Sequence, residues 1–402
     1  MVSKKKLYRN IIIVLMVALL YFSTTSFLPF SLGNNTVNLT DEEYEVFLKF
    51  KELYEVNELV QELYYKPIDE EKLLDGVLSG LLFGLDDPYS YYYTPEEFKK
   101  MEEDDKGEYA GVGLQIMSDY KTGLCTVSRV FLDSPSFDVG IKKGDILIKV
   151  EDLDVDVYTL QEAVNIMRGH VGEPVNITML RNNEEVDFVV TREIVQVNRV
   201  NSMMLPQDVG YIALYDFTGD TTAKDFETHM DKLMENNPKS LILDLRDNSG
   251  GWVNNATDIA DMFIDKGIIT YLEYNDGSKE EYSAKKGVKY NIPMVILINE
   301  YSASATELLS IALKEYGLAT LMGKQSYGKG VAQIVLPVGK RGGGMQMTVA
   351  EYFSPLGTQV HEIGVPVDIE VSLKEGDNTM YQLGDLDDIQ LKHAFDYALT
   401  IQ

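Results

Sequence analysis

The sequence predicts a chain of several domains that combines α/β parts with a mainly β part. Three patterns support this fold class. Apolar residues recur at helical spacing between positions 41 and 81. Short β-branched runs with one helical stretch fill positions 109 to 195, and strand and helix patterns alternate from 209 to 372. We therefore expect five segments, namely 1–33, 34–106, 107–196, 197–372 and 373–402.

Composition excludes several classes of partner and site. The 402 residues include 36 Lys and Arg against 64 Asp and Glu, a net charge of −28, and such a surface repels nucleic acid. The single cysteine, Cys125, rules out an internal disulfide framework and a cysteine-based zinc site, and we expect it to be buried in a strand. The four histidines lack metal-ligand spacing. We expect neither a metal nor a cofactor.

The first 33 residues predict a membrane anchor or a signal peptide. Basic residues at positions 4–9 precede an apolar run, 11–22, which 27–32 extends toward the ~20 residues that a membrane helix needs. No A-x-A cleavage site or lipobox cysteine follows, which favours an uncleaved single-pass anchor in the cell membrane over a secreted form. The basic residues then stay cytoplasmic, and the chain from about Asn34 is expected outside the cytoplasm.

The helical segment 34–106 contains a turn rich in aspartate and tyrosine. Residues 85–91 read Leu-Asp-Asp-Pro-Tyr-Ser-Tyr, a composition that is typical of a turn. These tyrosines form either a binding surface or, the commoner fate of such side chains, a packed cluster.

The segment 107–196 has five strand-like runs and one helical run. This pattern resembles a PDZ domain, and Gly111-Val112-Gly113-Leu114 resembles its carboxylate-binding loop. Successive backbone N–H groups beside glycines can hold a chain terminus while an edge strand pairs with the peptide. The alternative is a turn that only requires glycine. The resemblance implies a domain that engages the C-terminal tails of protein substrates.

Two strand-to-helix turns in the α/β segment are candidates for a site. They follow the apolar strands 240–245 and 294–298, and sites in such sheets lie at the carboxyl ends of strands. The first turn, Asn-Ser-Gly-Gly at 248–251, echoes a chymotrypsin-like motif, but that class also needs His and Asp in a β-barrel. We interpret its glycines as a close backbone approach with N–H groups available to an oxyanion, or as a tight turn alone.

The second turn places Ser304 at the start of a helix. Apolar residues at helical spacing begin at Ala305, and Gly317 ends the pattern. With Glu307, Ser304 matches a capping box, which is a sufficient structural reason for a serine here. The functional alternative is a nucleophile placed where helix N–H groups and the helix dipole stabilise negative charge.

A nucleophilic serine needs a base, and the candidate is Lys329, which lies between two glycines. A crowded apolar site would lower the lysine pKa from its ordinary ~10.4 and make it a usable base near neutral pH. Two alternatives remain. Lys329 is either a surface lysine or part of a phosphate loop, although Gly330 stands where that loop requires Ser or Thr.

The run Ser-Ala-Ser-Ala-Thr-Glu at 302–307, followed by Gly-Lys-Gly and a glutamine, resembles the signature of the C-terminal processing, or tail-specific, peptidases. The resemblance implies a serine peptidase of the Ser–Lys type. It assigns Ser304 as the nucleophile, Lys329 as the general base and Gln333 as the residue that orients the lysine. Thr306 replaces the usual serine at a position without a catalytic role.

The same resemblance has implications for the oxyanion site and the fold. It implies that the N–H groups of Gly250 and Ala305 bind the oxyanion. It also implies an α/β peptidase core with ClpP/crotonase-like layers, preceded by a PDZ-like domain and a helical N-terminal region. Asp385 is expected to cap a C-terminal helix over 386–399. This helix needs an apolar partner, either the N-terminal helices or a second subunit, and family members often form homo-oligomers.

The sequence thus predicts a membrane-anchored serine endopeptidase, a hydrolase, that cuts protein substrates near their C-termini. Its partners are protein tails and, through the N-terminal segment, the membrane. The alternative is a catalytically inactive scaffold that binds tails at the membrane through its PDZ-like domain.

Overall fold

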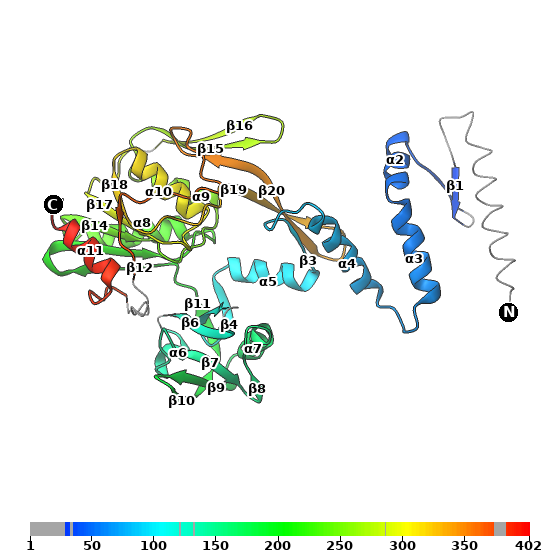
Figure 1. The fold of residues 1–402 in the computed structure, drawn as a ribbon, viewed down its shortest axis with the longest axis horizontal. Helices are drawn as coiled ribbons and strands as arrows, with labels where there is room; N and C mark the ends of the chain where they lie inside the picture. The colour runs from blue at the N-terminus through cyan, green and yellow to red at the C-terminus, as the bar shows by residue number, and fades with distance from the viewer. Residues whose placement is uncertain (1–28, 33–34, 120–121, 132, 286, 374–382) are drawn as a thin grey trace. The chain divides into compact units, whose positions relative to one another are not determined.

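The computed structural model describes residues 29–32, 35–119, 122–131, 133–285, 287–373 and 383–402. It divides into two compact units, Met1–Val77 and Leu78–Gln402. Figure 1 follows the elements of both along the chain.

The first unit contains a two-stranded antiparallel ladder and helices. Its elements are β1 (Pro29–Leu32), β2 (Asn35–Asn38), α2 (Asp41–Lys49), α3 (Lys51–Leu63) and the first turns of α4 (Glu70–Phe83). Helix α2 begins after Thr40, whose hydroxyl accepts the N–H of Glu43 while the Glu43 carboxylate accepts the N–H of Thr40. This reciprocal cap fixes the start of the helix.

The predicted membrane anchor falls mostly on residues outside the described ranges, 1–28 and 33. Residues 29–32, which extend the apolar run in the sequence, form strand β1 and not the end of a helix. Across the described part of the chain, no helix combines the length and the apolar character that crossing a membrane requires.

The β-rich domain folds around its own core. Its main sheet has the order β10-β9-β7-β6-β5, with β8 on β7, and β11 pairs with β4 in a separate ladder. The elements are β4 (Glu108–Gly111), β5 (Leu114–Asp119), β6 (Leu124–Val130), α6 (Pro135–Asp138), β7 (Ile146–Val150), β8 (Leu153–Asp154), α7 (Leu160–Met167), β9 (Pro174–Arg181), β10 (Glu184–Thr191) and β11 (Glu193–Gln196). Cys125 is buried in this core, as expected. Strand β5 is the last in the sheet order, so one of its edges faces no strand of that sheet.

A six-stranded sheet is the centre of the α/β core. Its order is β12-β13-β14-β17-β18-β21, with β12 antiparallel to β13 and the other neighbours parallel. The strands are β12 (Val200–Leu205), β13 (Val209–Leu214), β14 (Ser240–Asp244), β17 (Met294–Ile298), β18 (Ala319–Gly323) and β21 (Ile369–Glu370), with the 3-10 turn η1 (Pro206–Asp208) after β12. Every residue of β14 and β17 is buried, which explains their uninterrupted apolar sequences.

Helices cover both faces of this sheet (Figure 1). Helices α8 (Thr222–Met234), α9 (Val253–Asp261) and α10 (Ala305–Glu315) pack on one face, and α11 (Ile389–Ala398) packs on the other. Side chains of a strand point alternately to the two faces. Accordingly, Ile296 and Ile298 of β17 join the core beneath α10, whereas Val295 and Leu297 join the core beneath α11.

Helix α11 differs from the expectation in two respects. Its cap is Asp388, whose carboxylate accepts the N–H groups of Gln390 and Leu391, so the expectation that Asp385 caps it is wrong. Asp388 also forms an ion pair with Arg246 at 2.8 Å, which links the helix to the turn after β14. The apolar partner of the helix is the sheet of the same chain.

A second, antiparallel sheet has the order β16-β15-β20-β19, with β3 added beside β20. Its strands are β3 (Tyr91–Tyr93), β15 (Gly267–Tyr274), β16 (Lys279–Ala284), β19 (Val331–Val338) and β20 (Gly343–Phe353), and α5 (Pro95–Asp105) follows β3. The tyrosine-rich segment that precedes the β-rich domain in sequence is therefore part of the core. Tyr92 is buried there, whereas Tyr91 stays exposed.

Candidate active site

The two candidate turns meet at one edge of the central sheet. Strands β14 and β17 are parallel neighbours, so the turns that follow them leave the sheet on the same side. The N–H of Ala303 and the hydroxyl of Thr306 both donate to the carbonyl of Asn248, at 3.0 and 2.9 Å. A Cβ on Gly250 would lie 2.7 Å from the Cβ of Ser304 and 2.9 Å from the Ala305 nitrogen. The glycine is required because the two backbones touch.

Ser304 is held in an unusual backbone conformation at the start of α10. Its φ of 57° and ψ of −120° lie outside the regions that residues with a Cβ ordinarily occupy. Such strain persists only where the surroundings enforce it, and it is concentrated at functional sites. Ala305 is the first residue of the helix, so its N–H has no acceptor within the helix. The turn thus presents a serine beside a helix N-terminus.

Glu307 joins the serine turn to the lysine loop. One carboxylate oxygen accepts the N–H of Ser304 at 2.8 Å and the N–H of Lys329 at 2.9 Å. The other accepts the hydroxyl of Ser326 at 2.5 Å and the N–H of Gly328 at 2.7 Å. The side chain is completely buried. Burial raises the pKa of the Glu307 carboxyl above its ordinary range, although the four hydrogen bonds oppose that shift.

Tyr352 makes a second bridge between the same two residues. Its hydroxyl lies 3.0 Å from the carbonyl oxygen of Ser304 and 3.0 Å from that of Lys329. Burial, together with the nearby Glu307, raises the pKa of this phenol well above its ordinary value, so it acts as a proton donor to the carbonyls. The backbones of Ser304 and Lys329 are therefore fixed to each other through two buried side chains.

Lys329 lies in a crowded loop. Its glycine neighbours are required by close backbone contacts, because a Cβ on Gly330 would lie 2.2 Å from the nitrogen of His361 and one on Gly328 would lie 3.0 Å from that of Gly364. The lysine is half-buried, and its ammonium lies 4.7 Å from the centre of the Tyr89 ring. Burial lowers the pKa of Lys329 below its ordinary value, while the charges of Asp87 and Glu307 oppose the shift. A lowered pKa is the shift that a lysine needs in order to act as a general base near neutral pH.

Gln333 and Gly250 have partners that the sequence does not predict. The side-chain amide of Gln333 donates to the hydroxyl of Thr348 at 3.1 Å. The N–H of Gly250 donates to the side-chain oxygen of Asn248 at 2.9 Å, so an oxyanion at this N–H would have to share it with Asn248 or displace that oxygen. The roles of Gln333 in orienting Lys329 and of Gly250 and Ala305 in binding an oxyanion stay predictions.

The glycine loop of the β-rich domain leads into its edge strand. Gly113 has a φ of 85°, and a Cβ there would lie 2.3 Å from the Cβ of Ser134, so this position requires glycine for backbone reasons as well. The next residues along β5, from Gln115 to Met117, line a cleft of about 1280 Å³ that Lys329 and Ala303 also line. The cleft thus connects the edge-strand side of the β-rich domain with the lysine.

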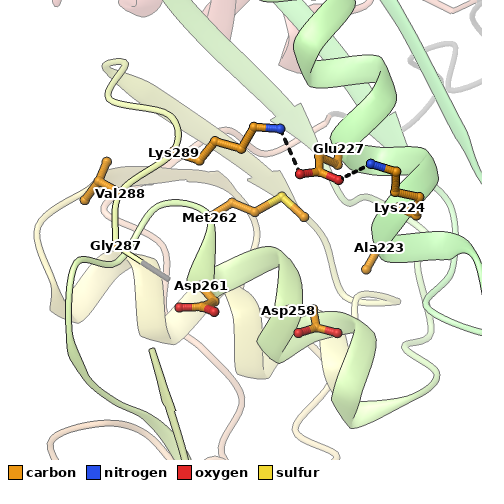
Figure 2. A pocket seen from close by; sticks show the side chains of 9 residues that line it. All are labelled: Ala223, Lys224, Glu227, Asp258, Asp261, Met262, Gly287, Val288 and Lys289. Atoms are coloured by element: carbon orange, nitrogen blue, oxygen red, sulfur yellow. Dashed lines mark hydrogen bonds and ion pairs between the residues drawn. The ribbon is translucent and has the colours of Figure 1, made fainter. Parts of the chain in front are cut away.

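A second hollow, of about 470 Å³, lies between α8, α9 and the loop before β17 (Figure 2). Lys224 and Lys289 both form ion pairs with Glu227 there, at 2.5 and 2.8 Å. Among the described residues, no group of three or more His, Cys, Asp or Glu side chains is arranged to hold a metal ion. The predicted site residues all lie elsewhere.

Sequence reasoning missed the part that four residues play at the site. Tyr352 and Thr348 follow no motif of their own. Asp87 and Tyr89 lie in the turn at 85–91 that the sequence singles out, but nothing in the sequence connects that turn with Lys329. The capping-box pattern does identify Glu307, but as a local cap only. Its contacts with Ser326, Gly328 and Lys329 depend on the tertiary fold.

Comparisons with known proteins match each part of the chain. Family models match residues 208–371 (peptidase family S41), 109–191 (PDZ domain) and 22–97 (the N-terminal domain of the activating protease CtpB). The carboxy-terminal processing protease CtpA of Bacillus subtilis is 32% identical over 92% of this chain and 78% of its own length. The carboxy-terminal-processing protease of Bartonella bacilliformis is 32% identical over 84% and 77%. Among solved structures, the photosystem II D1 C-terminal processing protease covers 79% of this chain and 86% of its own, with a TM-score of 0.56 and 25% identity.

Proposed function

The chain belongs to peptidase family S41, a family of serine peptidases, and we propose that it is a membrane-anchored endopeptidase that cuts proteins near their C-termini by a Ser–Lys mechanism. One observation carries the mechanism. Glu307 and Tyr352 each form hydrogen bonds with the backbones of both Ser304 and Lys329. Two fully buried polar side chains therefore hold these two residues together. A capping serine and a surface lysine would not need this arrangement.

The reaction proceeds in two halves. Ser304 Oγ attacks the scissile carbonyl carbon while the neutral Lys329 amine takes the hydroxyl proton. The tetrahedral intermediate collapses, the C–N bond breaks, and the Lys329 ammonium returns the proton to the departing amine. Water then attacks the carbonyl carbon of the acyl-enzyme while Lys329 accepts a proton from the water. The bond to Ser304 Oγ breaks, Lys329 returns the proton to Oγ, and the new C-terminus is released.

The oxyanion of each intermediate is assigned to the N–H groups of Gly250 and Ala305. The close approach of Gly250 to Ser304 and Ala305 supports this assignment. Each such donor is typically worth ~2.7–4 kcal/mol of transition-state stabilisation. Gln333 is assigned to orient Lys329 by accepting a hydrogen bond from the lysine on its side-chain oxygen, while its NH2 group donates to Thr348.

The β-rich domain is proposed to select substrates by their C-terminal tails. A tail that pairs with the free edge of β5 would direct its carboxylate to the loop formed by Gly111, Val112, Gly113 and Leu114. The cleft between β5 and Lys329 supports this route. The names of the processing-protease relatives agree with cleavage near a C-terminus.

The proposal is tested with the full-length protein and fluorescein-labelled casein as a general protein substrate. Cleavage by the natural sequence and its loss in Ser304→Ala are expected, and mass spectrometry of the products locates the cut bonds. Membrane fractionation followed by treatment of intact cells with an added protease tests the anchor and its orientation. A catalytically inactive scaffold, the alternative function, would leave casein intact, and no observation favours it.

A further inference from the structure

The turn formed by Asp87, Pro88, Tyr89 and Ser90 is stabilised by hydrogen bonds to the carboxylate of Asp87. Asp87 accepts the N–H of Tyr89 at 3.0 Å on one oxygen and the hydroxyl of Ser90 at 2.5 Å on the other. Ser90 is only 5% exposed. An aspartate that bonds the backbone two residues ahead locks such a turn. The position of the Asp87 charge is therefore well defined.

The same turn is fastened to the strand beside the lysine loop. The Ser90 hydroxyl accepts the N–H of Thr348 at 2.9 Å. The side chain of Gln346 donates to the carbonyl of Tyr89 at 3.1 Å. Both Thr348 and Gln346 are on β20, which pairs with β19, and β19 begins two residues after Lys329. The turn and the lysine are thus held by adjacent strands.

The groups that face the Lys329 ammonium come from several elements. They are the ring of Tyr89 and the carboxylates of Asp87 and Glu307. Glu307 uses both of its oxygens on four other donors. Glu307 therefore both holds the backbone of the serine turn and acts on the ammonium. Asp87 and Tyr89 act on the ammonium without that second role.

A tyrosine face distinguishes the two protonation states of a lysine. The ring attracts an ammonium electrostatically, with an energy that grows when the pair is shielded from water, but it offers a neutral amine no comparable attraction. A fixed carboxylate acts in the same direction. Together they hold the protonated side chain in one place and release it when the proton leaves.

We propose that Asp87 and Tyr89 are positioning residues for the base of the reaction, which hold the Lys329 ammonium at the Tyr89 ring between turnovers and release the neutral amine toward Ser304. This inference rests on the proposed role of Lys329 as the base. It assigns to the Asp-Pro-Tyr-Ser turn a part in setting the pH at which the peptidase becomes active.

The first test needs no catalysis. Full-length protein carrying Ser304→Ala is labelled with [ε-13C]lysine, the Lys329 signal is identified by its loss in Lys329→Arg, and its titration is followed by NMR. Asp87→Asn should move the titration to lower pH, because a negative charge that stabilises the ammonium is gone. Asp86→Asn is the matched control. Asp86 is exposed and has a φ of 53°, a conformation that Asn tolerates, so the same charge change one residue away should leave the titration in place. Equal titration midpoints for the two variants would overturn the inference.

The second test follows kcat/KM for labelled casein against pH. The acid limb is the pH range in which kcat/KM rises as Lys329 loses its proton. Tyr89→Leu should move this limb to lower pH, by an amount that corresponds to an about two- to fivefold change in the proton-binding constant of Lys329. Tyr89→Phe keeps the ring face and should leave the limb unmoved. If the turn only braces β20, Tyr89→Leu lowers kcat/KM equally at every pH, and that result overturns the inference even if Asp87→Asn does not fold. Lys329→Arg separates the two proposals. An active Lys329→Arg would overturn the assignment of the base and this inference with it, whereas an inactive Lys329→Arg with an unmoved limb in Tyr89→Leu would overturn this inference alone.

Discussion

Ser304 and Lys329 donate their backbone N–H groups to the same oxygen atom, Oε2 of Glu307, at 2.8 and 2.9 Å. The nucleophile and the base of the proposed reaction, 25 positions apart in sequence, are thereby fixed to one buried carboxylate. Because one atom serves both residues, a change at Glu307 affects the placement of both at once.

Glu307→Gln is therefore expected to abolish cleavage and to destabilise the protein. Each carboxylate oxygen of Glu307 accepts two hydrogen bonds, and in glutamine an NH2 group replaces one of these oxygens. The donors that face the NH2 group lose their acceptor, and each buried donor left unsatisfied costs about 1–3 kcal/mol. Urea denaturation measures the loss of unfolding free energy, and casein cleavage measures activity. Glu300→Gln is the control. Its ion pair with Lys324 is largely exposed, so a change below about 1 kcal/mol and full activity are expected. Retained activity in Glu307→Gln would show that the shared carboxylate does not organise the site.

Ser304→Ala should eliminate peptide cleavage and leave the protein folded. Removal of a helix-capping side chain costs only about 0.5–2 kcal/mol, and the Ser304 N–H and carbonyl keep their partners in the variant. Ser249→Ala, which changes the exposed serine of the other turn, should cut casein at the rate of the natural sequence. Circular dichroism confirms that both variants are folded. Cleavage that survives in Ser304→Ala would assign the nucleophile to another residue.

The pH dependence of cleavage should follow Lys329 and no histidine. Burial lowers the pKa of this lysine, and the neutral amine is the active form, so kcat/KM rises with pH through one ionisation that lies below the ordinary value of a lysine. Lys329→Arg should be inactive, because arginine does not lose its proton. Replacing all four histidines should leave the rise in place. A folded histidine variant without activity would require a different base.

The same lowered pKa makes a prediction about stability. Between the folded-state pKa of Lys329 and the ordinary ~10.4, the unfolded chain binds the proton more tightly than the folded chain, so this residue makes unfolding free energy increase with pH in that window. The difference in unfolding free energy between the natural sequence and Lys329→Met, measured by urea denaturation at several pH values, should therefore grow in favour of the natural sequence as pH rises. A difference that is independent of pH would indicate that the lysine titrates alike in both states.

A free substrate C-terminus should be required for efficient cleavage. A carboxylate held by backbone N–H groups makes charge-assisted hydrogen bonds about twice as strong as neutral ones, and a terminal amide loses them. Two peptides that differ only in a C-terminal carboxylate or amide should thus differ clearly in kcat/KM. Equal values would remove the proposed role of the loop from Gly111 to Leu114. Gly113→Val does not serve as a test, because its side chain would collide with Ser134 and disturb the domain itself.

The sequence predicts those parts of the molecule whose signals are local. The apolar strands β14 and β17, the helix that starts at Ala305 and the convergence of the two turns all follow from periodicity and from the rule that sites lie at the carboxyl ends of parallel strands. Residue spacing alone left open whether Ser304 is a helix cap or a nucleophile, and whether Lys329 is a surface lysine or a base. The family resemblance is what predicted the catalytic roles.

The sequence does not predict contacts that depend on distant strands. Tyr352 reaches Ser304 and Lys329 only because β20 lies beside β19, and Tyr89 reaches the lysine only because β3 joins β20. The cap of α11 shows a smaller error of the same kind. Asp385 and Asp388 are equivalent as local capping residues, and the ion pair of Asp388 with Arg246 across the fold is the tertiary contact that only Asp388 makes.

Strand β3 joins the peptidase core although it precedes the β-rich domain in sequence, which limits how the domains of this chain can be exchanged. The family match for the peptidase begins at residue 208, yet the catalytic layer includes a strand and a turn from residues 87–93, and the whole β-rich domain lies between these two parts in sequence. The PDZ domain is thus an insertion within the peptidase and not a separate module that precedes it. Recombination that exchanged everything upstream of Val209 for another binding module would also remove the strand beside β20 and the aromatic wall of Lys329. The PDZ domain can therefore be exchanged between such enzymes only by cutting on both sides of the insertion, after β3 and before β12.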